Sequence, residues 1–156
     1  MRQRKERIRL KRIVSLLTVL VLTCTMFSTP AFAYRHTETT LIDLGNGLTA
    51  EQTITVYDQD FRASTKRASA TMEYKNNGEK IGTVTLTATF GYDGSDAWVV
   101  SASGSHTLES GWSYSGERIS DSGGTATLTA TIKSTKGLGQ FPVDISLTCS
   151  KNGDIS

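Results

Sequence analysis

Residues 111–116, with the sequence GWSYSG, are the stretch whose side chains come closest to a known chemical motif. Ser113 stands where the nucleophile of a G-x-S-x-G elbow would stand. However, Ser115 occupies the place of a required glycine, and the elbow also needs a strand-to-helix turn. We therefore expect Ser113 to be an ordinary strand serine and the chain not to be an enzyme.

Histidine and cysteine are too sparse for a catalytic pair or a metal centre. Beyond residue 33 the chain holds only His36, His106 and Cys149, at no ligand spacing. We expect His106 to be a solvated loop residue, and we expect neither a metal nor another cofactor. Cys149 would have no partner for a disulfide once Cys24 is removed with the N-terminus.

The tryptophans and their neighbours are the better candidates for binding. Trp112 and Tyr114 are two residues apart, so they share one face of a strand, and their neighbours are Gly and Ser rather than aliphatic residues. Packing in the core is the favoured interpretation, and a platform on which a sugar ring stacks is the alternative. Trp98 shares a predicted strand face with Val100 and Ala102, so we expect it in the core.

The first 33 residues have the three parts of a secretory signal peptide. A basic segment holds seven Lys and Arg between positions 2 and 12, and an apolar segment follows at 13–27. Ala31 and Ala33 form a small-residue cleavage site. The apolar segment is shorter than the roughly 20 residues that a membrane-spanning helix needs, and Pro30 ends it. We expect this helical signal to be cleaved after Ala33, leaving a secreted chain without a stable membrane span.

Removal of the signal changes the charge of the chain. Seven of the 17 Lys and Arg and one of the 15 acidic residues lie before residue 34, so residues 34–156 carry 10 basic and 14 acidic residues. The formal charge is then about −4, which does not indicate a nucleic-acid partner. These 123 residues match one domain, large enough to bury a core without disulfides.

Two threonine-rich stretches set the fold class. GTVTLTATF begins at Gly82 and GTATLTATI begins at Gly124, and in both threonine alternates with apolar residues. Strict alternation of this kind predicts half-buried β-strands. The flanking sequences differ, so we interpret the similarity as one strand pattern used twice rather than as a duplicated unit.

The same criteria predict eight strands and no helix after the signal. Turn signals separate them at intervals of roughly 8 to 12 residues, which favours an all-β, antiparallel β-sandwich of immunoglobulin-like architecture. The last strand carries Val143, Ile145, Leu147 and Cys149 on one face, so the thiol should point into the core. The predicted strands cover residues 39–44, 48–57, 68–75, 83–90, 97–105, 112–120, 125–132 and 141–150.

The stretches TLTATFGYDG, GWSYSG and ISLTCSKNGDIS together resemble a group of small secreted proteins from anaerobic Gram-positive bacteria. The resemblance extends over residues 44–156. It implies export, and it implies no activity or site residue, because the group is uncharacterised.

The sequence therefore favours a secreted, non-catalytic binding module whose partner is a glycan, a peptide or a cell-surface component. Any ligand contact is expected at Trp112 and Tyr114. The alternative is a structural protein of the cell envelope or matrix without a defined ligand.

Overall fold

The computed structural model describes residues 35–57 and 64–156. The described residues group into one compact unit. The predicted signal and its cleavage residues, Ala31 and Ala33, lie outside the described residues. Within the described part of the chain, no helix is long and apolar enough to cross a membrane.

All eight predicted strands are present, and several are longer than the alternation of residues indicated. The first begins at Arg35 rather than at residue 39, and the fifth continues to Leu108. The strands are β1 (Arg35–Gly45), β2 (Leu48–Tyr57), β3 (Thr65–Asn76), β4 (Glu79–Tyr92), β5 (Ala97–Leu108), β6 (Trp112–Ser122), β7 (Thr125–Ser134) and β8 (Gln140–Thr148).

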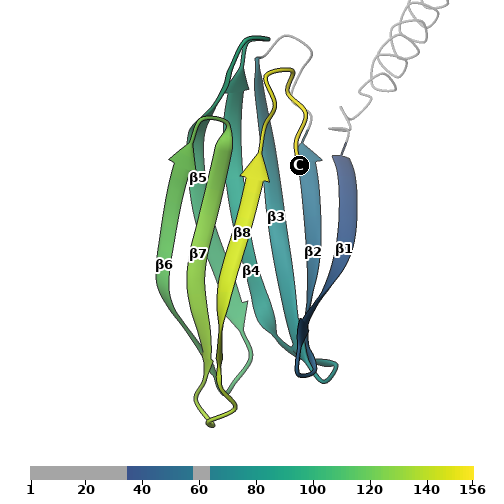
Figure 1. Cartoon of the computed structure of the whole chain (residues 1–156), viewed down its shortest axis with the longest axis vertical. Helices are drawn as coiled ribbons and strands as arrows, with labels where there is room; N and C mark the ends of the chain where they lie inside the picture. The colour runs from purple at the N-terminus through teal and green to yellow at the C-terminus, as the bar shows by residue number, and fades with distance from the viewer. Residues whose placement is uncertain (1–34, 58–63) are drawn as a thin grey trace, which may run out of the picture. The chain divides into compact units, whose positions relative to one another are not determined.

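The strands form two antiparallel sheets, and within each sheet neighbouring strands are also consecutive in the sequence (Figure 1). The larger sheet has the order β1-β2-β3-β4-β5, and the smaller has the order β6-β7-β8. Immunoglobulin domains connect their strands as Greek keys. Here both sheets are simple meanders, so the immunoglobulin-like part of the prediction does not describe the connectivity.

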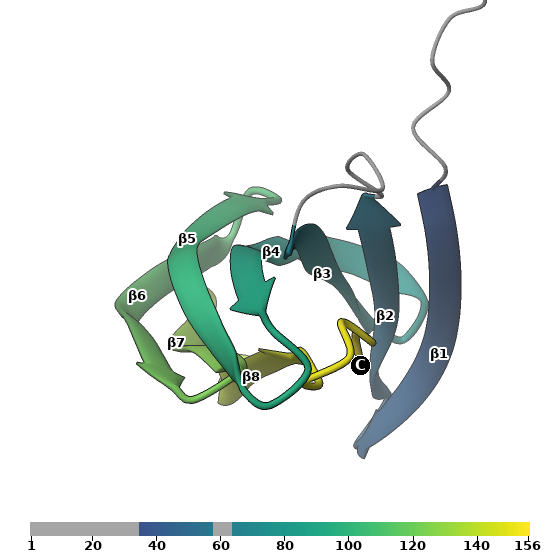
Figure 2. The ribbon, with the colours of Figure 1, turned by 90° about the horizontal axis from the view of Figure 1, so that it is seen from above.

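The two sheets share one core, but they differ in width. β8 packs against β3 and β4, β7 packs against β4 and β5, and β6 lies beside β5. Figure 2 shows β1 at the far edge of the larger sheet, beyond the strands that the smaller sheet faces. Buried side chains of both sheets build the core, among them Tyr74, Leu86, Phe90, Leu128, Ile132 and Ile145.

The first threonine-rich stretch lies in β4, next to the middle strand of the larger sheet. The second lies in β7, the middle strand of the smaller sheet. In β4 the residues Val84, Leu86, Ala88 and Phe90 are buried, and the intervening threonines face outward. β7 repeats the pattern with Ala126, Leu128 and Ile132. Outward hydroxyls meet across strands, as in Thr71–Thr85 at 3.0 Å and Thr83–Thr107 at 2.7 Å. The predicted alternation is therefore confirmed for both stretches.

The prediction for the end of the chain is also confirmed. Cys149, which directly follows β8, is 4% exposed and lies in the core together with the inward residues of that strand. Burial raises the pKa of its thiol, because the low-dielectric surroundings disfavour the thiolate. After a turn, the last two residues return along β8, where Thr148 and Ser156 exchange two backbone hydrogen bonds of 2.8 and 2.9 Å.

The prediction that Trp98 lies in the core is wrong. Trp98 is 44% exposed and Val100 is more exposed still, both on the outer face of β5. Thr89 pairs with Ser101, but the next residue, Phe90, pairs with Val99, so β5 holds one extra residue at this point. Such a bulge reverses the alternation. Ala102 therefore faces inward, while Trp98 faces outward and lies over Gly91, whose missing side chain leaves space for the indole.

Candidate functional site

Trp112, the first residue of β6, is half-buried and lies partly in the core and partly at the surface. Its ring meets Phe141 edge-on, with 6.1 Å between the ring centroids, and Phe141 in turn contacts Tyr74 at 5.2 Å. One side of the indole thus rests on an aromatic cluster. No residue of the described chain forms a hydrogen bond with the indole N–H, which leaves this donor available.

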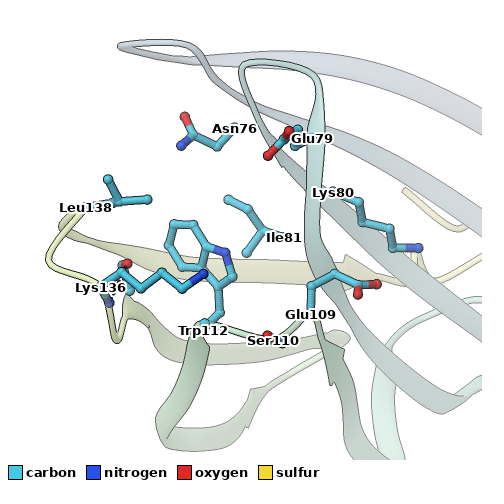
Figure 3. A pocket seen from close by; sticks show the side chains of 11 residues that line it. Asn76, Glu79, Lys80, Ile81, Glu109, Ser110, Trp112, Lys136 and Leu138 are labelled. Carbon is cyan, nitrogen blue, oxygen red and sulfur yellow. Dashed lines mark hydrogen bonds between the residues drawn. The ribbon is translucent and has the colours of Figure 1, made fainter.

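The other side of Trp112 lines a surface pocket of about 490 Å³. The pocket lies among the β3–β4 turn, the β5–β6 turn and the β7–β8 loop (Figure 3). Trp112, Ile81 and Leu138 supply its apolar surface, and Leu138 is 67% exposed at the rim. The polar and charged lining residues are Asn76, Glu79, Lys80, Glu109, Ser110, Ser134 and Lys136, and Gly111 completes the lining.

Backbone hydrogen bonds fix the connections that surround this pocket. The N–H of Glu109 donates to the carbonyl of Ile81 at 2.8 Å, which joins the β5–β6 turn to β4. The N–H of Thr135 donates to the carbonyl of Gly111 at 2.9 Å, which joins the β7–β8 loop to the β5–β6 turn. These two bonds hold the β5–β6 turn and the β7–β8 loop in place beside Trp112.

Some charged groups of the pocket form ion pairs and others do not. Lys80 donates to Glu73 at 2.8 Å, and Lys75 lies 2.9 Å from the same carboxylate. These hydrogen bonds, from Lys80 first and then Lys75, lower the pKa of Glu73. Within the described residues, Glu79, Glu109 and Lys136 form no ion pair. Figure 3 shows Glu79 and Glu109 to the right of Trp112 and Leu138 to the left, with the Lys136 side chain drawn across the indole.

Tyr114 points to the same face of β6 as Trp112 but belongs to different surroundings. Its ring stacks on His106 with 3.8 Å between the centroids, and its hydroxyl donates to Glu117 Oε2 at 2.7 Å. Tyr114 does not line the pocket. The structure therefore separates the two aromatic residues that the sequence had grouped.

His106 is exposed, as expected, but the expectation that it lies in a loop is wrong. It lies in β5, which runs to Leu108, and its ring packs on Tyr114 across the line where β5 and β6 approach each other. Glu117 covers the same line, because its carboxylate lies over Gly104. Burial, followed by the hydrogen bond to Glu117, raises the pKa of Tyr114. These contacts give Tyr114 a structural role between the sheets.

Sequence reasoning did not identify the charged residues around Trp112. Glu79 begins β4, Glu109 lies between β5 and β6, and Lys136 lies between β7 and β8, and none of them belongs to a recognisable motif. A meander places alternate turns at the same end of its sheets, so this connectivity would have brought residues 76–79, 109–111 and 135–139 together. No group of three or more His, Cys, Asp or Glu side chains suited to a metal ion occurs among the described residues.

Comparisons with known proteins add no assignment to this geometry. No family model, curated protein or solved structure matches the chain.

Proposed function

We propose that the chain is an exported, non-catalytic binding module whose ligand contacts centre on Trp112. The observation that supports this most is the pocket, in which a half-buried indole lies among two carboxylates and an ammonium group that form no ion pair within the described residues. Pockets with an apolar surface and a few convergent polar groups are the usual form of ligand sites. Export rests on the signal peptide proposed for residues 1–33.

The ligand class that fits best is a glycan. The exposed side of the Trp112 indole offers an apolar surface to the C–H face of a sugar ring, as aromatic side chains commonly do. Glu79 and Glu109 accept hydrogen bonds from sugar hydroxyls, and Lys136 donates to hydroxyl or carbonyl oxygens. The free indole N–H adds one donor. An extended peptide that places one side chain on Trp112 is the second ligand class.

The most informative variants change the rim and leave the core intact. Glu109→Gln and Lys136→Ala alter exposed residues of the pocket, so we expect the fold to be unaffected. Both variants should lose binding to a glycan array or to purified peptidoglycan by roughly tenfold, because a buried ligand hydrogen bond contributes about 1–2 kcal/mol. Thr127→Ala, on the outer face of β7, is the matched control and should bind like the parent.

The proposal fails if the parent protein binds no glycan, peptidoglycan or peptide in these assays. It also fails if binding occurs and the rim variants bind like the control. The first result would favour the alternative of a structural envelope protein without a defined ligand.

A further inference from the structure

The edges of the two sheets are protected to different degrees. A strand at a sheet edge presents unpaired N–H and C=O groups, which form a template for another strand unless the edge is covered or interrupted. The larger sheet has its edges at β1 and β5, and the smaller has its edges at β6 and β8.

The edges at β5 and β6 protect each other. The two strands lie side by side, and the N–H of Val99 donates to the carbonyl of Gly123 at 3.2 Å. Between them, His106 stacks on Tyr114 and Glu117 covers Gly104. On this side of the unit, therefore, the edges of β5 and β6 are not accessible for pairing with a further strand.

The edge at β8 is protected in two other ways. Pro142 lacks the N–H that a neighbouring strand would need. The backbone N–H and the carbonyl of Thr148 are both hydrogen-bonded to Ser156 at the end of the chain. Only a short central part of β8 is left open to pairing.

The edge at β1 has none of these protections. β1 contains no proline, and its pairing with β2 is continuous from Arg35 to Asp43, where the register shifts. Residues 36–41 are exposed, and Leu41 is 72% exposed. Figure 2 shows β1 as the outermost strand, with no described strand beyond it.

We propose that β1 pairs antiparallel with β1 of a second copy, with the two-fold axis at Thr39. The proposal is independent of the function assigned to the pocket. Thr39 is the midpoint of residues 35–43, so this register uses the whole regular ladder on both copies. The interaction is strand addition, in which main-chain hydrogen bonds supply the affinity, and it joins the two larger sheets into one.

The charges of β1 support the same register. A two-fold axis at Glu38 would place two carboxylates directly opposite each other, which is destabilising. The axis at Thr39 instead places Glu38 opposite Thr40 of the second copy. Glu38 also has a neighbour on its own strand, since His36 Nε2 lies 3.1 Å from Glu38 Oε1.

Charge substitutions at the proposed axis test the register directly. Thr39→Lys and Thr39→Glu each place two like charges face to face, so each variant alone should be monomeric. An equimolar mixture of the two should form a heterodimer, because Lys and Glu then face each other. Thr53→Lys is the matched control: Thr53 pairs with Thr39 within one chain, on the same sheet face but one strand away from the edge. This control should remain dimeric.

The measurement is sedimentation equilibrium on residues 34–156, with thermal melts to verify that each variant is folded. The parent and Thr53→Lys should show twice the mass of one chain. A parent that stays monomeric up to its solubility limit overturns the proposal. Dimers of both Thr39 variants alone would also overturn it, because the contact would then lie elsewhere.

Discussion

The surroundings of the two tryptophans differ although both rings are partly exposed. Trp98 lies on the outer face of β5, over the backbone of Gly91, and does not line the pocket. Trp112 lies in a hollow between three turns, with Glu79, Glu109 and Lys136 around it. Exposure of a large aromatic ring is therefore not sufficient to indicate a site. A concave surface and converging polar groups distinguish Trp112, and two of those groups, Glu79 and Lys136, come from residues far from it in the sequence.

The largest expected difference between the two rings is in stability. Trp112→Ala removes a ring that packs on Phe141 at the edge of the core, and should lower the free energy of unfolding by about 3 kcal/mol. Trp98→Ala removes a ring that covers only the outer face, and should cost about 1 kcal/mol. Urea denaturation of the two variants measures both values. Equal losses would contradict the distinction.

A second prediction concerns the ionisation of Tyr74, which belongs to the same aromatic cluster as Trp112. Tyr74 is 1% exposed and contacts Phe141. Burial, followed by the charge of Asp144, raises its pKa from 10.0 to about 12. A phenol whose pKa is raised in the folded state stabilises that state fully below pH 10, and this contribution is lost as the pH rises towards 12.

The parent should therefore lose about 2 kcal/mol more stability than Tyr74→Phe between these pH values. Urea denaturation at a series of alkaline pH values measures the difference. Parallel pH profiles for the two proteins would show that the Tyr74 hydroxyl is not held in a desolvated environment.

The contact between Trp98 and Gly91 can be tested by a double-mutant cycle. A Cβ at residue 91 would overlap the indole, so Gly91→Ala should displace Trp98 at a cost of about 1–2 kcal/mol. In a Trp98→Ala background the same change should cost little, because the overlap is gone. Additive losses would mean that the ring does not lie on Gly91.

The smallest expected effect is at the rim of the Trp112 pocket. Glu79→Gln should alter the free energy of unfolding by less than about 0.5 kcal/mol, since the side chain is exposed and has no ion-pair partner among the described residues. Thermal melts of this variant and of the parent should overlap. A clear shift would show that the rim charges serve folding rather than recognition.

Alternation of residue types predicted the eight strands, the inward face of β4 and the burial of Cys149, because each of these depends on neighbours in the sequence. It failed at Trp98, where one extra residue in β5 reverses the faces and no residue type marks the bulge. It also failed to group the rim of the pocket, because the meander that brings three turns together is a property of the whole chain. Tyr114 was grouped with Trp112 by spacing alone, whereas its contacts depend on β5.

Fluorescence of single-tryptophan variants tests the central claim most directly. Trp98→Phe leaves Trp112 as the reporter, and Trp112→Phe leaves Trp98, so each variant reports on one of the two surfaces during titration with soluble peptidoglycan fragments. Our account predicts a saturable change in emission when Trp112 is the reporter and none when Trp98 is the reporter. A change at Trp98, or no change at Trp112 under conditions in which the parent binds, would contradict it.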